Sequence, residues 1–207
     1  MLKTYELFID ENDFQDGIHA ISLVSDPAIE SDWITLSKNK KEIKLKTIND
    51  EKRILMGAAL IPEKLIYRKN EATGEEFNIV FSKDTVRKAS ELFFKQGFQS
   101  ESTLEHEINL HDNKVVERWI VEDSNKDKTA LYDVEGPVGT WVVSMKIEND
   151  QVYQMAKEGL IKGFSIEGYF SDKAINQSKQ EKINFDFSQE VKVLKEIIEI
   201  IENKTKK

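Results

Sequence analysis

The chain has 207 residues, 33% of them charged, and a net charge of −8, which suits one domain with a single core and short appendages. The acidic balance argues against a nucleic-acid partner, because nucleic-acid binders normally present a basic surface. The absence of cysteine excludes disulfides, a thiol nucleophile and cysteine metal ligands. Neither a signal-peptide pattern nor an apolar run of the roughly 20 residues needed to span a bilayer is present. We therefore expect a cytoplasmic protein that does not bind a membrane.

Short strands dominate the pattern along the chain. Alternating or apolar runs predict strands over residues 1–10, 18–24, 53–61, 76–81, 103–110, 115–122, 140–147 and 164–170. Helical spacing predicts one helix that begins after Ser82 and ends before Gly97. A second helix follows Asn149 or Asp150 and ends near Gly163. Many short strands with two or three helices predict a β-rich α+β fold.

Composition also divides the chain into segments. The main domain is expected over residues 1–172, with an exposed Lys/Glu-rich linker inside it at 36–52. A polar linker over 173–184 then leads to an amphipathic C-terminal helix in 185–207. Its apolar residues recur at alternating spacings of four and three, which suits either docking on the domain or a short coiled coil.

A candidate nucleophile follows the second helix. Ser165 lies between Gly163 and Gly168, directly after a predicted helix and inside a predicted strand. A serine hydroxyl becomes a good nucleophile only when a base accepts its proton. The pattern is not the Gly-x-Ser-x-Gly elbow, because Glu167 occupies the place of the second glycine. The simpler interpretation is a helix stop followed by a strand.

A histidine and a glutamate could complete the site. His106 lies on the apolar face of the predicted strand 103–110, and a turn at 111–114 would pair it with Trp119. Glu117 would then be a diagonal neighbour of His106, about 7 Å away between Cβ atoms, and could orient the imidazole. The alternatives are that His106 is a core residue, and that Glu117 pairs with a lysine or faces water.

The other histidines carry less chemistry. His111 is expected in an exposed turn and His19 on the surface of its strand. His106 and His111 have acidic neighbours, but no established metal-ligand spacing is present. No metal or organic cofactor is therefore expected.

Several motifs occur together in a fixed order: Glu105-His106, Val116-Glu117-Arg118-Trp119-Ile120-Val121-Glu122-Asp123, Lys126-Asp127-Lys128, Gly139-Thr140-Trp141 and Lys162-Gly163-Phe164-Ser165-Ile166-Glu167-Gly168. With Asp26-Pro27-Ala28-Ile29 and Met56-Gly57-Ala58 upstream, the combination resembles the phage prohead (procapsid) serine proteases, specifically their XkdF-like branch. The resemblance covers roughly residues 5–172. It implies a fold like that of the herpesvirus assemblin proteases, with a compact barrel-like sheet flanked by helices.

The resemblance also implies an activity and partners. Such an enzyme is an endopeptidase that cleaves scaffold and major capsid protein inside the prohead, in the host cytoplasm, and often cuts itself. The family's serine and histidine carry over onto Ser165 and His106. Glu117 rests on the hairpin argument more than on the family, and its competitors as third residue are Asp123, Asp127 and Asp133. A homo-oligomer remains open.

Two other functions fit the same residues. A capsid-assembly or scaffolding protein could keep the protease fold without activity. A different hydrolase, such as an esterase, could use the same nucleophile. The amphipathic helix in 185–207 suits a tether to scaffold or capsid subunits under the protease interpretation.

Overall fold

The structure is a computed structural model, which describes residues 2–13, 15–27, 34–35, 52–70, 72–132, 134 and 136–174. The predicted C-terminal helix in 185–207 and nearly all of the predicted linker at 36–52 lie outside these residues. The predicted linker over 173–184 also lies outside them, except for its first two residues.

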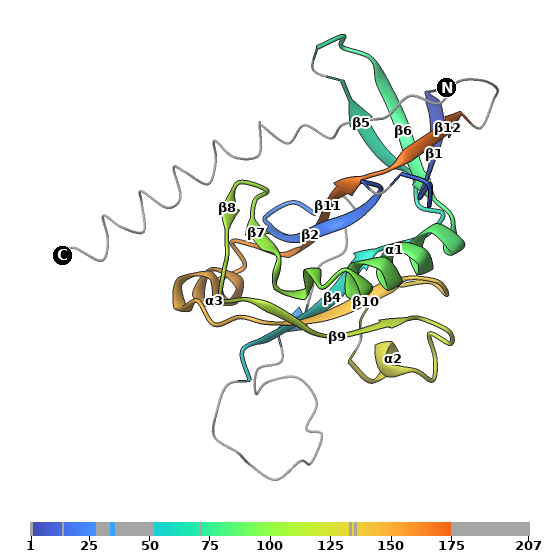
Figure 1. Cartoon of the computed structure of the whole chain (residues 1–207). Helices are drawn as coiled ribbons and strands as arrows, with labels where there is room; N and C mark the ends of the chain where they lie inside the picture. The colour runs from blue at the N-terminus through green and yellow to red at the C-terminus, as the bar shows by residue number, and fades with distance from the viewer. Residues whose placement is uncertain are drawn as a thin grey trace.

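The described strands form three four-stranded sheets (Figure 1). The first contains, in spatial order, β12 (Ser171–Ala174), β1 (Lys3–Phe8), β6 (Glu76–Phe81) and β5 (Ile66–Lys69). The second contains β3 (Ile34–Thr35), β4 (Ile54–Leu60), β10 (Trp141–Lys146) and β9 (Lys114–Ile120). The third contains β11 (Gly163–Tyr169), β2 (Gly17–Val24), β7 (Ser102–Leu104) and β8 (Ile108–Asn109). The β-rich α+β prediction is confirmed, with three open sheets rather than a closed barrel among the described residues.

One hydrophobic core joins the three sheets. Leu7 of the first sheet, Leu23 of the third and Trp141 of the second are all fully buried in the same cluster. Burial of such side chains contributes about 1.5–3 kcal/mol each relative to exposure. The three sheets therefore form one folding unit.

The helices begin where the sequence places their caps. In α1 (Lys83–Lys95) the Ser82 hydroxyl accepts the Thr85 N–H, and in α3 (Asp150–Lys157) the Asn149 side chain accepts the Val152 N–H. A short 3-10 helix, η1 (Phe98–Ser100), follows α1, and α2 (Lys128–Tyr132) lies between β9 and β10 in the chain. None of the described helices is long and apolar enough to cross a membrane.

Strand β2 is central to the third sheet. It pairs antiparallel with β11 and parallel with β7, and this register aligns Ser165, Ser22 and Thr103 across three strands. Beyond a bulge in this pairing, a Cβ on Gly168 would lie 2.0 Å from the Gly17 carbonyl oxygen. Only glycine fits there, so Gly168 permits the close approach of β11 to β2.

The predicted hairpin between residues 103–110 and 115–122 does not form. The chain turns back after Leu104, so β8 pairs with β7, while β9 pairs with β10 of another sheet. The turn comes from Glu105 and His106, which both have positive φ, 50° and 63°, and the Glu107 N–H donates to the Leu104 carbonyl. His106 therefore lies in a tight turn and not on the apolar face of a strand.

The C-terminal boundary of the domain also differs from its prediction. β12 pairs with β1 up to Ala174, so the residues at 173 and 174 belong to a strand rather than to the linker.

Candidate active site

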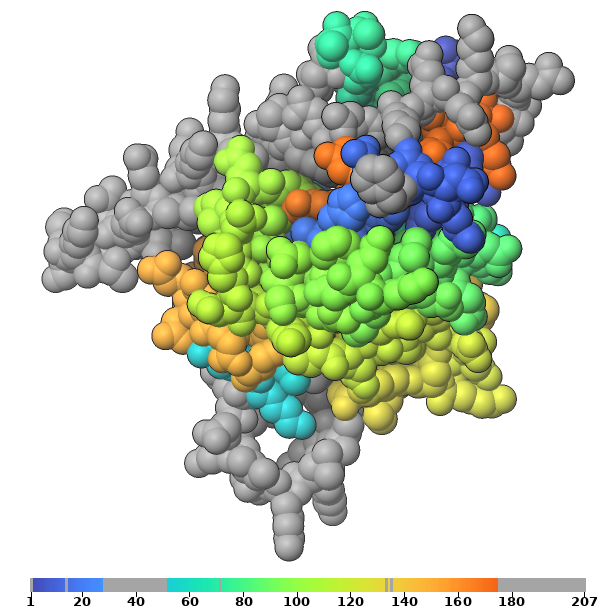
Figure 2. Space-filling model, viewed as in Figure 1, coloured from blue at the N-terminus to red at the C-terminus, as the bar shows by residue number. Residues whose placement is uncertain are grey.

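A polar face of the third sheet carries the candidate nucleophile. Ser165 and Glu167 are two residues apart on β11, so their side chains point to the same side of the sheet. Ser22 and Thr103 are aligned with Ser165 on the next two strands, and their side chains share that side. Figure 2 shows the β7–β8 segment in yellow-green beside orange and blue atoms of the segments that contain β11 and β2.

The β7–β8 turn brings His106 onto this face. Its backbone N–H donates to the Ser22 hydroxyl at 2.8 Å, and its ring Nδ1 lies 3.0 Å from Oε1 of Glu167. The His106 side chain is only 4% exposed, and that of Glu167 is 26% exposed. A carboxylate can only accept, so Nδ1 carries the proton in this pair and Glu167 fixes the tautomer of the ring.

A buried carboxylate anchors the same turn. Glu105 is 2% exposed, its Oε1 accepts the Ser25 N–H, and its own N–H donates to the Leu23 carbonyl at 3.0 Å. These bonds tie the turn to the end of β2. Non-glycine residues with positive φ are uncommon, and such strain concentrates at functional sites.

The surroundings of Glu167 favour its ionised form. Burial acts to raise the pKa of Glu167, but hydrogen bonds from His106 and Thr103, together with the charge of His106, outweigh it and lower the pKa below its ordinary value. The Thr103 hydroxyl donates to Oε1, the same oxygen that contacts His106. Glu167 is thus a carboxylate held by two donors.

Ser165 joins this cluster through the strand register, not through a side-chain hydrogen bond among the described residues. It is 7% exposed and lies directly opposite Ser22, whose hydroxyl holds the His106 backbone. Directly opposed Cβ atoms lie about 4.5–5.5 Å apart in antiparallel pairs. The structure therefore brings Ser165 and His106 to the same polar face of one sheet.

The structure places Glu117 in a different cluster. It lies on β9 in the second sheet, where it accepts hydrogen bonds from the Lys128 ammonium and, at 3.1 Å, from the Ser144 hydroxyl. The hairpin that supported its pairing with His106 is absent because β9 pairs with β10. Glu117 therefore has the lysine partner that the sequence offered as an alternative.

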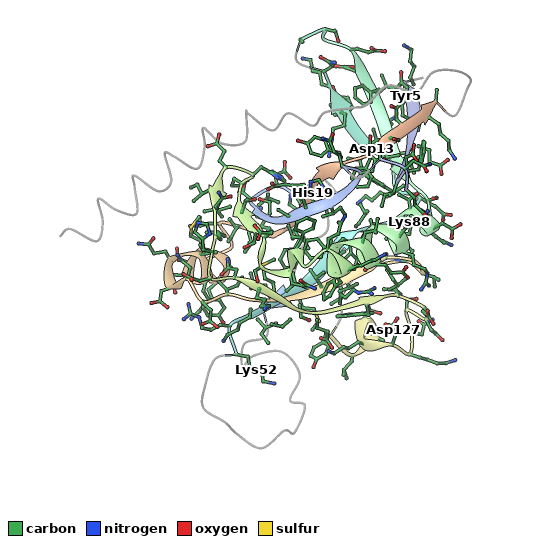
Figure 3. All side chains as sticks on the ribbon, viewed as in Figure 1. Tyr5, Asp13, His19, Lys52, Lys88 and Asp127 are labelled. Atoms are coloured by element: carbon green, nitrogen blue, oxygen red, sulfur yellow. The ribbon has the colours of Figure 1, made fainter. Side chains whose placement is uncertain are left out.

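The competing aspartates make local contacts in the loop around α2. Asp127 accepts the Thr129 and Glu122 N–H groups, and these bonds, together with the Thr129 hydroxyl, lower its pKa despite the opposing effect of burial. Asp123 accepts the Asn125 N–H and pairs with Lys126. Figure 3 shows Asp127 beside α2, apart from His19 on β2. Asp133 lies outside the described residues.

The remaining histidines lie where the sequence suggests, with one difference. His111 is exposed, whereas His19 is half-buried and its ring packs against Phe98 and Tyr169, with ring centroids 5.3 and 5.6 Å away. Within the part of the chain that the structure describes, no group of three acidic, histidine or cysteine side chains could hold a metal ion.

Gly139, Thr140 and Arg118 of the quoted motifs carry donor groups that could serve an oxyanion, but these groups already have acceptors. The Gly139 N–H donates to the Val121 carbonyl and the Thr140 N–H to the Pro137 carbonyl. Arg118 donates to the Ser90 hydroxyl at 3.0 Å and lies over the Phe94 ring.

Sequence reasoning missed Glu167 and Thr103. Glu167 was noticed only as a departure from the Gly-x-Ser-x-Gly pattern. The alternation of β11 already places it on the face of Ser165, which was the signal available. Thr103 could not be found in this way, because its place beside Glu167 depends on the parallel pairing of β2 with β7.

A serine on the same sheet face as a histidine–carboxylate pair is an arrangement that suits a hydrolase with a serine nucleophile. A comparison with protein families supports this class. Residues 41–175 match the family model described as "Putative phage serine protease XkdF". Because the match covers well over half of the chain, the protein belongs to this family of phage serine proteases. No curated protein and no solved structure matched the chain.

Proposed function

We propose that this protein is a serine endopeptidase in which Ser165 is the nucleophile, His106 the general base and Glu167 the carboxylate that orients the base. The observation that carries the proposal is the contact between His106 Nδ1 and Glu167 Oε1, on the face of the sheet that also carries Ser165. Family membership supplies the reaction class.

The chemistry is acyl transfer in two halves. Nδ1 of His106 holds its proton toward Glu167, so Nε2 is the nitrogen that accepts the proton of the Ser165 hydroxyl. The serine oxygen then bonds to the scissile carbonyl carbon, and the imidazolium returns the proton to the leaving amine as the C–N bond breaks. Water repeats the sequence on the acyl-enzyme and releases the acid.

Glu167 replaces Glu117 in this scheme for a physical reason. An orienting carboxylate must stay ionised and must accept from the imidazole. Glu167 accepts from His106 and has a lowered pKa, whereas Glu117 is paired with Lys128 and lies on another sheet.

The substrates we propose are the major capsid protein and scaffold of a tailed phage, cleaved within the assembling prohead in the host cytoplasm. Cleavage of the protein itself belongs to the same proposal. The support is membership of a phage protease family, together with the motif combination that resembles prohead proteases.

The test is coexpression with the neighbouring capsid and scaffold proteins, read by intact-protein mass spectrometry. Wild type should give discrete truncated products, and Ser165→Ala should give none, since removal of a nucleophilic serine costs on the order of 10⁶-fold in kcat. Ser124→Ala, at an exposed serine, is the matched control and should cleave like wild type.

Full-length proteins with both wild type and Ser165→Ala, in proheads that still assemble, would contradict the proposal and favour a capsid-assembly role. Hydrolysis of small esters without any peptide cleavage would favour an esterase. Cleavage retained by Ser165→Ala would refute the assignment of the nucleophile.

A further inference from the structure

We infer that Thr103 is a positioning residue of this site: its hydroxyl fixes the Glu167 carboxylate so that one oxygen faces His106. The inference rests on the proposed function, because it assigns Thr103 a part in the same acyl transfer. Thr103 lies outside the motif combination that resembles the prohead proteases.

Thr103 and His106 reach the same oxygen from one segment of chain. Thr103 lies on β7, three residues before His106, and its Oγ1 donates to Glu167 Oε1, which is 3.0 Å from Nδ1 of His106. Glu167 comes from β11, with β2 between the two strands. The hydroxyl therefore ties the nucleophile's strand to the turn that carries the base.

The need for such a tie follows from the exposure of Glu167. Its side chain is 26% exposed, so a single bond to His106 would leave the carboxylate able to swing toward water. A second donor on the same oxygen restricts that rotation. Thr103 is itself 6% exposed, and its β-branched side chain has few rotamers, so the hydroxyl is held in place.

A hydrogen bond to the ionised form also lowers a carboxyl pKa. Among the described residues, His106 and Thr103 are the two that lower the pKa of Glu167, and of these two only His106 is itself titratable. Loss of the Thr103 hydroxyl should therefore let Glu167 protonate at a higher pH.

Ser102 offers a matched comparison on the same strand. It is 4% exposed, its hydroxyl donates to the Leu110 carbonyl at 3.0 Å, and as the neighbour of Thr103 its side chain points to the opposite face of the sheet. Deleting either hydroxyl removes one side-chain hydrogen bond. Only the Thr103 deletion removes a donor from the carboxylate.

The experiment compares Thr103→Val, Thr103→Ser and Ser102→Ala in the full chain. The Glu167 side-chain carboxyl is titrated by ¹³C NMR, with its resonance assigned by its loss in Glu167→Gln. We expect the titration midpoint to move to higher pH in Thr103→Val and to stay at the wild-type pH in Thr103→Ser and Ser102→Ala. This readout needs no substrate, and a purely structural role for Thr103 would not move it.

The second readout is cleavage of the coexpressed capsid substrate once its cut site is known. Thr103→Val should lower kcat by roughly 10- to 100-fold, because a hydrogen bond to a charged group is lost, with KM little changed. Thr103→Ser should restore most of kcat.

An unchanged Glu167 midpoint in a folded Thr103→Val protein would overturn the inference, as would an unchanged kcat. If Thr103→Val does not fold, Thr103→Ala with the same titration decides the matter. If the Glu167 midpoint shifts in Thr103→Val but the wild-type protein cleaves no substrate, the proposed function is refuted and the Thr103 contact stands.

Discussion

Two clusters in this protein share one design and differ in one partner. In the third sheet, Glu167 accepts from the Thr103 hydroxyl and from His106. In the second sheet, Glu117 accepts from the Ser144 hydroxyl and from Lys128. Each glutamate thus binds one hydroxyl and one basic nitrogen.

The basic partner and its burial decide what each cluster can do. Lys128 donates to Glu117 and also lies over the Trp119 and Tyr132 rings, so its ion pair is a fixed clamp for α2. Histidine can give up and regain a proton near neutral pH. The His106 side chain is 4% exposed, against 36% for Lys128, so water weakens the first pair less. A glutamate bound to a hydroxyl is therefore not evidence of catalysis until its cationic partner is known.

The largest effect that separates the clusters should come from the glutamates themselves. Glu167→Gln should lower kcat for peptide cleavage on the order of 10³–10⁴-fold, since the amide no longer stabilises the imidazolium or fixes its tautomer. Glu117→Gln is the matched control and should keep kcat near wild type. The same mass-spectrometric cleavage assay measures both variants. Equal losses of cleavage in the two variants would contradict the assignment of the catalytic role to the third-sheet cluster alone.

The backbone that holds the third-sheet cluster can be destabilised without substituting any of its polar residues. Gly168→Ala should destabilise the fold by about 3 kcal/mol or more, because the new Cβ would lie 2.0 Å from the Gly17 carbonyl oxygen. Gly159→Ala is the comparison: its φ is +72° with no atom within 4 Å of the new Cβ, so only backbone strain of about 1 kcal/mol remains. Urea denaturation of both variants measures the difference, and similar losses would show that β2 can move away from β11.

The pH dependence of stability sharpens the comparison further. The pKa of Glu167 lies below its ordinary 4.5 in the folded protein, so its ionised form stabilises the fold. That contribution is fully present above the ordinary pKa and is lost as the pH falls through the lowered one. Wild type should therefore exceed Glu167→Gln in stability at pH 7, and the gap should narrow progressively below pH 4.5 in denaturation curves. A gap that widened toward acid would contradict the lowered pKa.

The smallest effect is expected in the second-sheet cluster. Lys128→Met keeps the apolar stem and removes an ion pair whose side chains are 36% and 41% exposed, so the cost should be at most about 1 kcal/mol. Cleavage activity should not change. Thermal denaturation checks the first point, and a loss of activity would indicate that α2 contributes to the site.

Local patterns predicted much of the fold. Caps at Ser82 and Asn149 and the alternation of β11 depend on neighbouring residues, and each has its predicted place. The hairpin prediction was wrong because the apolar residues from Leu104 to Leu110 alternate as they would in a continuous strand. The chain instead reverses at Glu105 and His106, and no residue pattern in the sequence indicates their left-handed backbone. Ser165 and His106 were each a candidate from local pattern alone, and the structure brings them to one sheet face. Their acidic partner could not be assigned securely, because strand pairing over long sequence distances decides which glutamate lies beside the histidine.

The left-handed backbone of the Glu105–His106 turn has a consequence for attempts to stabilise the protein. Glycine or asparagine at position 106 would relieve conformational cost, yet neither can shuttle a proton from the serine. Selection for thermal tolerance alone would therefore favour replacements that remove the proposed base. Directed evolution of a hardier enzyme should hold this position fixed and seek its gains elsewhere in the chain.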